Sequence, residues 1–291
     1  MHFSIVVPVY NTAKFLPECI AALKSQDYPA DQYEIIMVDN NSQDDSRRIL
    51  EQAEGVDVLT ETKQGSYAAR NRGVSVARGK ILAFTDSDCI PSRNWLRSIE
   101  TGFEDAQIQI QLGSRRPRPD IGLIGLISDY EDNKVAVIIG STEVQAYYAF
   151  TNNMAVRRRT LDQYGPFLER ERGSDTIFLR RVVDGEGFQA VAYVPSMRTV
   201  HAEMSSLMTY YWKTFTYGRS HCHYSQLVAS RPMTKAECLR AFRLTMSARG
   251  SSLFRSALLQ GVLAGNLMAW NLGRMLGFLE VFRRSLARVS Q

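Results

Sequence analysis

The chain has 291 residues, of which 45% are hydrophobic and 22% charged, and its net charge is +5. These values are typical of a soluble globular protein with one large domain or two small ones. Four scattered cysteines without a CxxC pair exclude a dense disulfide framework and favour a reducing cytosol. No basic leader precedes an apolar run at the N-terminus, so we expect no signal peptide.

The positive charge is concentrated near the C-terminus. Residues 231–291 hold ten Lys or Arg against Glu237 and Glu280, about +8, which leaves about −3 for the rest of the chain. Such a basic tail favours an anionic contact, either a membrane surface or an acidic partner. We expect no nucleic-acid partner.

The first 90 residues alternate between strand and helix patterns. Short apolar runs are typical of strands covered on both faces, and they lie at 5–9, 35–38, 56–59 and 81–84. Helical patterns between them begin at Thr12, at Asp45 or Ser46, and at Ser66. Repeated strand–helix–strand units predict an α/β fold with a doubly wound, mostly parallel sheet and helices on both faces.

The later pattern is less regular. Residues 108–148 indicate short strands and a Pro/Arg loop at 115–119, followed by a helix at 174–184 and a strand at 190–195. Two helical stretches then follow, an aromatic one at 205–225 and a long apolar one at 251–282. We therefore expect a C-terminal helical extension.

Polar residues follow three of the predicted strands directly, at 10–11, 39–40 and 86–88. Ligands bind beyond the C-terminal ends of strands in such sheets. Asp86 and Asp88 share a face at a strand end, where two carboxylates repel each other unless a cation or proton neutralises them. Their hard oxygen atoms suit Mg²⁺ or Mn²⁺, although Asp and Ser are also common in solvated turns.

Several ordered motifs resemble the family 2 glycosyltransferases, over roughly residues 3–201. They are VVPVYN at 6–11, VDNNSQD at 38–44, GSYAARNRG at 65–73, ARGKILAFTDSD at 77–88, NMAVRR at 153–158, YGPF at 164–167 and SD at 174–175. The resemblance implies a GT-A fold and inverting transfer from a nucleotide diphosphate sugar, with UDP favoured. It implies a catalytic domain at 1–204, with a nucleotide-binding half at about 1–90 and an acceptor-binding half at 91–204, and an extension at 205–291.

The resemblance also implies roles for individual residues. The nucleotide-sugar site would comprise Pro8, Tyr10, Asn11, Asp39, Gly65, Arg70, Asp86 and Ser87. Asp39 would contact the base, Arg70 the base or phosphate, and Asp86 the ribose or a metal-bound water. The metal ligands would be Asp88, Asp86 and His201. Other interpretations stay open: a turn at Asp39, a solvated helix face at Arg70 and a structural role for His201.

Inversion requires a carboxylate that deprotonates the acceptor hydroxyl, and Asp175 is the candidate. It lies in the first turn of a predicted helix, where the dipole favours the ionised form, although a plain helix-start acid is the alternative. Family members commonly place Glu directly before this Asp, whereas this chain has Ser174. Glu171 is a candidate substitute from the preceding loop.

The apolar tail leaves three explanations open. Residues 256–273 are too interrupted by polar side chains to favour a membrane span. Two small-xxx-small spacings, at 261–265 and 273–277, permit close helix contact. The stretch is a helix packed on the catalytic domain, a homo-oligomer seam, or an anchor on a membrane surface.

We interpret the chain as an inverting hexosyltransferase that uses Mn²⁺ or Mg²⁺ and a nucleotide-sugar donor. The expected acceptor is a glycan or a lipid-linked hydroxyl in cell-surface polysaccharide or glycolipid biosynthesis. We expect the protein in the cytoplasm, with peripheral contact on the cytoplasmic face of the membrane. The alternatives are another nucleotide-using α/β enzyme, disfavoured because G-x-G-x-x-G and Walker motifs are lacking, and a non-catalytic scaffold with a GT-A fold.

Overall fold

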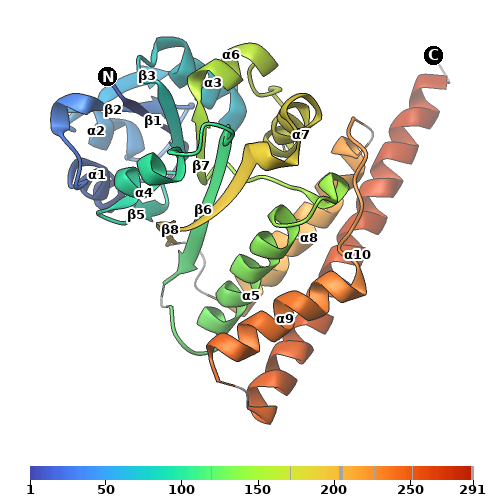
Figure 1. The fold of residues 1–291 in the computed structure, drawn as a ribbon. Helices are drawn as coiled ribbons and strands as arrows, with labels where there is room; N and C mark the ends of the chain where they lie inside the picture. The colour runs from blue at the N-terminus through green and yellow to red at the C-terminus, as the bar shows by residue number, and fades with distance from the viewer. Residues whose placement is uncertain (119, 171, 203–205, 226, 251, 290–291) are drawn as a thin grey trace. The chain divides into compact units, whose positions relative to one another are not determined.

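A computed structural model describes the chain except residues 119, 171, 203–205, 226, 251 and 290–291. The chain divides into two compact units (Figure 1). Unit 1 comprises Met1–Arg116 and Ile139–Ala202, and unit 2 comprises Pro117–Ile138 and Glu203–Gln291. Unit 2 therefore takes in an internal segment as well as the C-terminal region expected as an extension.

An eight-stranded sheet forms the centre of unit 1, in the order β3-β2-β1-β4-β7-β6-β8-β5. Its strands are β1 (Phe3–Val9), β2 (Tyr33–Asp39), β3 (Asp57–Thr60), β4 (Ile81–Thr85), β5 (Cys89–Pro91), β6 (Ile110–Pro117), β7 (Asn153–Arg157) and β8 (Val191–His201). Strands β3, β2, β1 and β4 pair in parallel. β7 pairs antiparallel with β4 and β6, and β5 pairs antiparallel with β8. The three polar segments at 10–11, 39–40 and 86–88 therefore all follow strands of the parallel half, namely β1, β2 and β4.

The helices of unit 1 are α1 (Leu16–Lys24), α2 (Ser46–Glu51), α3 (Ser66–Val76), α4 (Trp95–Gly102), α6 (Arg158–Tyr164) and α7 (Ser174–Glu186), with short turns η1 (Ala30–Gln32), η2 (Val144–Ala146) and η3 (Phe188–Ala190). All seven residues of β1 are buried, as expected for a strand covered on both faces. The core against it includes Leu16, Leu23 and Trp95. The predicted α/β fold is confirmed.

Unit 2 consists of α5 (Gly122–Ile139), α8 (Leu207–Tyr224), α9 (Lys235–Ala248) and α10 (Leu253–Val289). Leu126 and Tyr130 of α5 share a core with Ala241 and Met246 of α9 and Leu259 of α10. The described residues include no helix that is both long and apolar enough to cross a bilayer.

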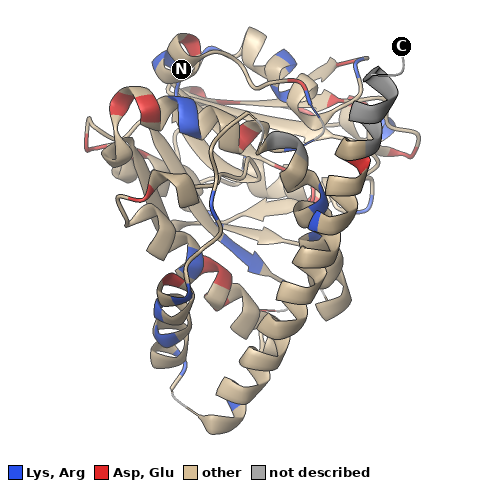
Figure 2. Ribbon diagram, turned by 90° about the vertical axis from the view of Figure 1, so that its right-hand side faces the viewer, with Lys and Arg blue, Asp and Glu red and all other residues tan. Residues whose placement is uncertain are grey.

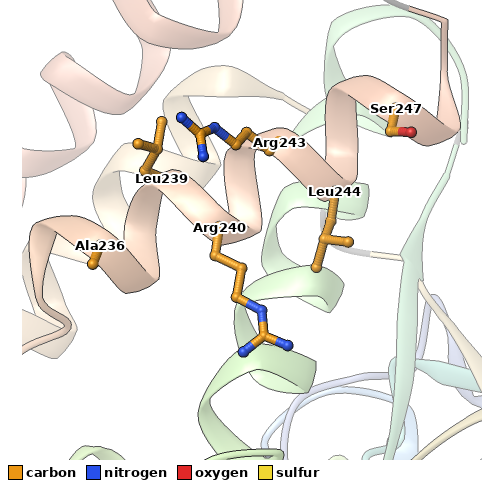
Figure 3. Close-up of a pocket in the computed structure, with 6 residues that line it drawn as sticks. All are labelled: Ala236, Leu239, Arg240, Arg243, Leu244 and Ser247. Atoms are coloured by element: carbon orange, nitrogen blue, oxygen red, sulfur yellow. The ribbon is translucent and has the colours of Figure 1, made fainter.

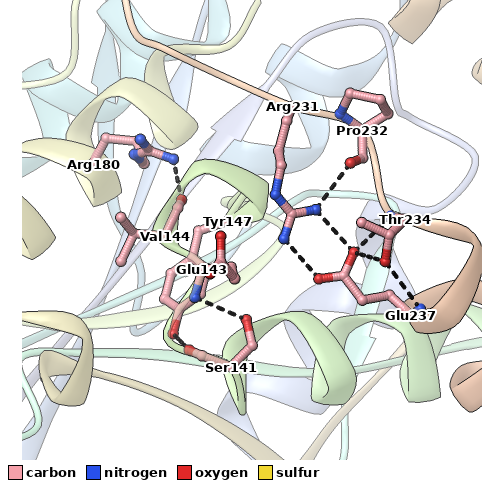
Figure 4. Close-up of polar contacts among 9 residues, drawn as sticks. All are labelled: Ser141, Glu143, Val144, Tyr147, Arg180, Arg231, Pro232, Thr234 and Glu237. Atoms are coloured by element: carbon pink, nitrogen blue, oxygen red, sulfur yellow. Dashed lines mark hydrogen bonds and ion pairs between the residues drawn. The ribbon is translucent and has the colours of Figure 1, made fainter.

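Polar bonds fix the start of α9. Thr234 caps it by accepting the backbone N–H of Glu237, whose carboxylate accepts the N–H of Thr234 and a bidentate pair from Arg231 (Figure 4). The same figure draws the Tyr147 hydroxyl of unit 1, which donates to the Ser141 carbonyl at 2.5 Å. On α9 itself, two leucines and two arginines line a shallow hollow of about 380 Å³ (Figure 3).

The irregular pattern expected over residues 108–148 was wrong. That region contains the eight-residue strand β6 and the 18-residue helix α5. Polar residues in the middle of α5 hid its helical period, because their partners lie far along the chain in unit 2. Glu131 accepts from the Tyr210 hydroxyl at 2.8 Å, Asn133 donates to Thr245 at 3.0 Å, and Asp129 pairs with Arg249.

Candidate nucleotide-sugar and metal site

The parallel register brings the first polar strand ends together. Val9 is opposite Asp39, and the N–H of Asn40 donates to the Val9 carbonyl at 2.8 Å. Pro8 lies inside the buried strand β1, whereas Tyr10, just beyond its end, is 49% exposed. Of these two predicted nucleotide contacts, Tyr10 is therefore the one whose side chain is accessible to a ligand.

Asn11 locks the loops after β1 and β2 to each other. Its side-chain oxygen accepts the N–H of Gln43 at 2.7 Å, and its own N–H donates to Ser42 at 3.2 Å. Asn11 has a φ of 51°, a conformation that Asn tolerates better than most residues. The expected nucleotide contact of Asn11 would therefore come from a side chain already engaged in the loop.

Asp39 is buried, 5% exposed, and accepts the N–H of Ser42 at 3.4 Å. The turn interpretation of this residue is thus observed, and its contact with a base stays a prediction. The neighbouring Asn40 donates to the carbonyls of Glu61 and Lys63, both at 2.8 Å, and accepts the N–H of Gly65 at 2.7 Å. Gly65, with a φ of 139°, is the residue before α3, so Asn40 holds the start of that helix.

Arg70 of α3 forms an ion pair with Asp86, which follows β4. Arg70 is 3% exposed, so the solvated helix face was wrong. Its guanidinium also lies over the ring of Tyr67, 5.6 Å from the centroid. Removal from water raises the pKa of Asp86 above its usual value; Arg70 opposes that effect and the charge of Asp88 adds to it. An extra cation at this place would relieve the repulsion between the two carboxylates.

Ser87 and Asp88 follow Asp86 in the short loop between β4 and β5. Ser87 is buried and accepts a hydrogen bond from Thr12 at 2.8 Å, which ties the loop after β4 to the loop after β1. Asp88 Oδ2 is 2.9 Å from Nε2 of His201. The pairing of β5 with β8 produces this contact, because Cys89 and His201 are opposite each other in the register.

Ligand atoms of Asp88, Cys89 and His201 all lie within 4.8 Å of one another. A carboxylate with an imidazole is a suitable donor set for a divalent ion, and a second carboxylate, Asp86, is two residues away. Burial raises the pKa of Cys89 well above its usual value, which keeps the thiol protonated and leaves Asp88 and His201 as the better ligands. The residues present therefore fit Mn²⁺ or Mg²⁺, though no ion is assigned.

Asp175 is the second residue of α7, which begins directly after Gly173, whose φ is 84°. One carboxylate oxygen accepts the N–H of Thr176 at 2.8 Å, and the carboxylate interacts with the buried hydroxyl of Tyr67. Burial raises the pKa of Asp175, and the Thr176 N–H, Arg70 and Tyr67 only partly oppose it. The position at the helix start was expected to favour the ionised carboxylate. Burial has the larger effect on the pKa and favours the protonated form. A raised pKa makes the ionised carboxylate a stronger base.

Ser174 is completely buried, and its hydroxyl has no hydrogen-bond partner among the described residues. A glutamate at this position would therefore have its side chain attached to a buried part of the backbone. The proposed substitute, Glu171, lies outside the described residues.

The sequence reasoning missed Tyr67, Thr12 and Cys89 as neighbours of the site. Tyr67 connects Arg70 to Asp175, and its ring is 5.8 Å from that of Phe167. Its place three residues before Arg70 on a helix was the one available signal, since i and i+3 share a face.

A parallel α/β half with acidic strand ends, joined to an antiparallel half that supplies a histidine, defines a GT-A fold. The chain belongs to glycosyl transferase family 2, because the sequence model of that family matches residues 4–167. The structure is similar to a solved structure of the mannosyltransferase PcManGT from Pyrobaculum calidifontis in complex with GDP-Man and Mn²⁺. The TM-score is 0.65 at 20% sequence identity, and the match covers 96% of this chain and 86% of PcManGT. At such identity it supports the fold alone.

Two relatives are similar in sequence. Glycosyltransferase AglE of Haloferax volcanii is 32% identical over 187 residues, 62% of this chain and 61% of the relative. Glycosyltransferase GlyG of Streptococcus pneumoniae is 36% identical over 116 residues, 38% of each chain. The chain thus spans less than two thirds of the length of these relatives.

Proposed function

We propose that this chain transfers a sugar, with inversion, from a nucleotide diphosphate donor to a hydroxyl of a glycan or lipid-linked acceptor. UDP-sugars are the favoured donors. The observation that carries the proposal is a series of contacts and electrostatic interactions within unit 1, from Asp88 and His201 through Asp86, Arg70 and Tyr67 to Asp175. Family membership supports the reaction class, and polysaccharide or glycolipid synthesis is the proposed setting.

The donor end of this set suits a diphosphate. Cleavage of the sugar–phosphate bond leaves negative charge on the leaving group, and a divalent ion bound by Asp88 and His201, with Asp86 nearby, would supply compensating charge there. Arg70 adds a permanent positive charge held rigidly by burial. Tyr10 and Asp39 lie at the adjacent strand ends, where the nucleoside would bind.

At the acceptor end, Asp175 takes the proton of the attacking hydroxyl. The acceptor oxygen forms a bond to the anomeric carbon of the sugar, and the bond from that carbon to the phosphate oxygen breaks. The nucleoside diphosphate leaves, and the proton of the hydroxyl passes to the carboxylate. Tyr67 and the Thr176 N–H hold the carboxylate in place. Such a positioned base contributes about 10² to 10⁴ in rate.

Replacement of the base is the direct test. Asp175→Asn should lower sugar transfer by about 100-fold or more, while Mn²⁺-dependent binding of UDP, followed by thermal shift, persists. The matched control is Asp184→Asn, an exposed acid on the same helix, which should transfer sugar normally. The pKa of Asp175 is raised in the folded state, so its ionised form destabilises the protein near neutral pH, and the Asn variant should be no less stable. Unimpaired transfer by the Asn variant would refute the assignment.

A non-catalytic scaffold is the second candidate, favoured by Ser174 in place of glutamate, since its hydroxyl has no hydrogen-bond partner within the described part of the chain. Slow hydrolysis of a nucleotide sugar by the wild-type chain, absent in Asp175→Asn, would exclude it. Thermal-shift screening of UDP-, GDP- and dTDP-sugars with and without Mn²⁺ identifies the donor. A hundredfold excess of a donor over its Kd stabilises the folded state by about 2.7 kcal/mol.

A further inference from the structure

The long helix α10 of unit 2 exposes an apolar stripe. In Figure 2 most of the described part of this helix is drawn in tan, and from Leu253 to Phe282 its charged residues are Arg255, Arg274 and Glu280. Five side chains on it recur at steps of four and three residues, and each is more than 40% exposed: Met268, Leu272, Met275, Leu279 and Phe282. Such spacing places them along one face of the helix. We call these five residues the α10 stripe.

The opposite side of α10 is already used within unit 2. A Cβ on Gly273 would collide with the backbone carbonyl of Phe215 in α8, and a Cβ on Gly277 with that of Arg219. On α8, Gly218 approaches the backbone of Trp270 in the same way. The small-xxx-small spacing at 273–277 therefore joins α10 to α8 of the same chain and is not available to a second copy. The α10 stripe is what remains.

The stripe is wider than a seam between two helices. In a two-stranded coiled coil, charged residues commonly flank the apolar positions. Here Leu276 and Phe278, 38% and 63% exposed, flank the stripe and extend its apolar surface. A broad apolar face fits a flat apolar medium better than one partner helix.

The C-terminal part of the chain that contains α10 has a net positive charge. Glu280, the one acid within α10, is paired with Arg219 at 2.7 Å. Residues 231–291 carry ten Lys or Arg against two acids. A second copy would bring this excess against itself, whereas an anionic surface would neutralise it.

We infer that α10 lies along an anionic lipid bilayer, with the α10 stripe inserted at the boundary between headgroups and acyl chains. The proposed contact is peripheral, because in it the helix lies in the plane of the membrane surface. The inference rests on unit 2 alone and does not depend on the proposed transfer reaction.

Flotation of the full chain with vesicles tests the inference. Vesicles with about one third phosphatidylglycerol in phosphatidylcholine should carry the wild-type protein, and pure phosphatidylcholine vesicles should carry much less, because basic residues near the surface are attracted by anionic lipid. The triple variant Leu272→Gln, Met275→Gln, Leu279→Gln should bind at least tenfold more weakly. These side chains are about half exposed, so the fold should persist.

The matched control replaces two exposed apolar residues of unit 1, Val76→Gln and Phe188→Gln, and should bind like the wild type. Equal thermal unfolding of both variants verifies folding. Absence of wild-type binding, or unchanged binding by the triple variant, overturns the inference. So does a wild-type dimer that the triple variant turns into a monomer while neither protein floats, since the stripe would then join two copies. Failure of sugar transfer with flotation intact would count against the proposed function only.

Discussion

Replacement of Asn153 by Ala should destabilise unit 1 severely. Asn153 begins β7 and is fully buried. Its side-chain nitrogen donates to the carbonyls of Ser114 and Met197, at 2.7 and 2.8 Å, and its oxygen accepts the indole N–H of Trp95 at 2.9 Å. One side chain therefore connects β7 to β6, β8 and α4.

The magnitude follows from these three bonds. Each contributes about 0.5–1.5 kcal/mol net, and the indole N–H left without a partner adds a desolvation cost of about 1–3 kcal/mol. We expect a loss of about 3–5 kcal/mol in the free energy of unfolding, measured by urea denaturation followed by tryptophan fluorescence and circular dichroism.

Asn153→Asp sharpens the test. The carboxylate still accepts from Trp95 but donates to neither carbonyl, and it is buried with a charge. The Asp variant should thus be at least as unstable as the Ala variant at pH 7 and should recover part of its stability as the pH falls and the carboxyl becomes protonated. The control is Gln107→Ala, an exposed amide nearby in sequence to β6. A cost for Asn153→Ala within about 1 kcal/mol of that control would refute the reasoning.

Three further predictions concern the base, a buried glutamate and the α8–α10 contact. Tyr67→Phe removes an interaction that lowers the pKa of Asp175, so the acidic limb of kcat/KM for transfer should move to higher pH; an unmoved limb would separate Tyr67 from the base. Burial opposes ionisation of Glu34, but Ser4 and Arg78 hold its pKa below the usual value. Glu34→Gln should therefore cost about 1–3 kcal/mol at pH 7, and urea titrations should show this deficit shrinking as the pH falls through the folded-state pKa. Gly273→Ala should lower the free energy of unfolding by about 1–3 kcal/mol through overpacking, whereas Gly261→Ala, with open space around it, should not.

The sequence predicted the parallel half of the sheet well, because strands buried on both faces are continuous apolar runs between helical periods. The family resemblance also predicted His201 as a metal ligand together with Asp88, and the pairing of β5 with β8 brings these two side chains together. The role of each of these residues in binding a ligand stays a prediction.

The rest depended on partners far along the chain. The acids and amide within α5 look like a loop until Arg249, Tyr210 and Thr245 are placed against them. Burial likewise reversed the expected direction of the pKa shift at Asp175, because the effect of a helix start is visible in sequence and the depth of a side chain is not.

The hydrogen bond between His201 and Asp88 joins residues 113 positions apart in sequence, where the edge strand β5 pairs with β8. The two carboxylates of Asp86 and Asp88 are therefore present early in the chain, while the imidazole of His201 comes with β8, the last strand in sequence. During synthesis, this contact can form only after β8 has been synthesised, by which point nearly all of unit 1 is present. A nascent chain that lacks β8 would therefore contain Asp86 and Asp88 without the histidine.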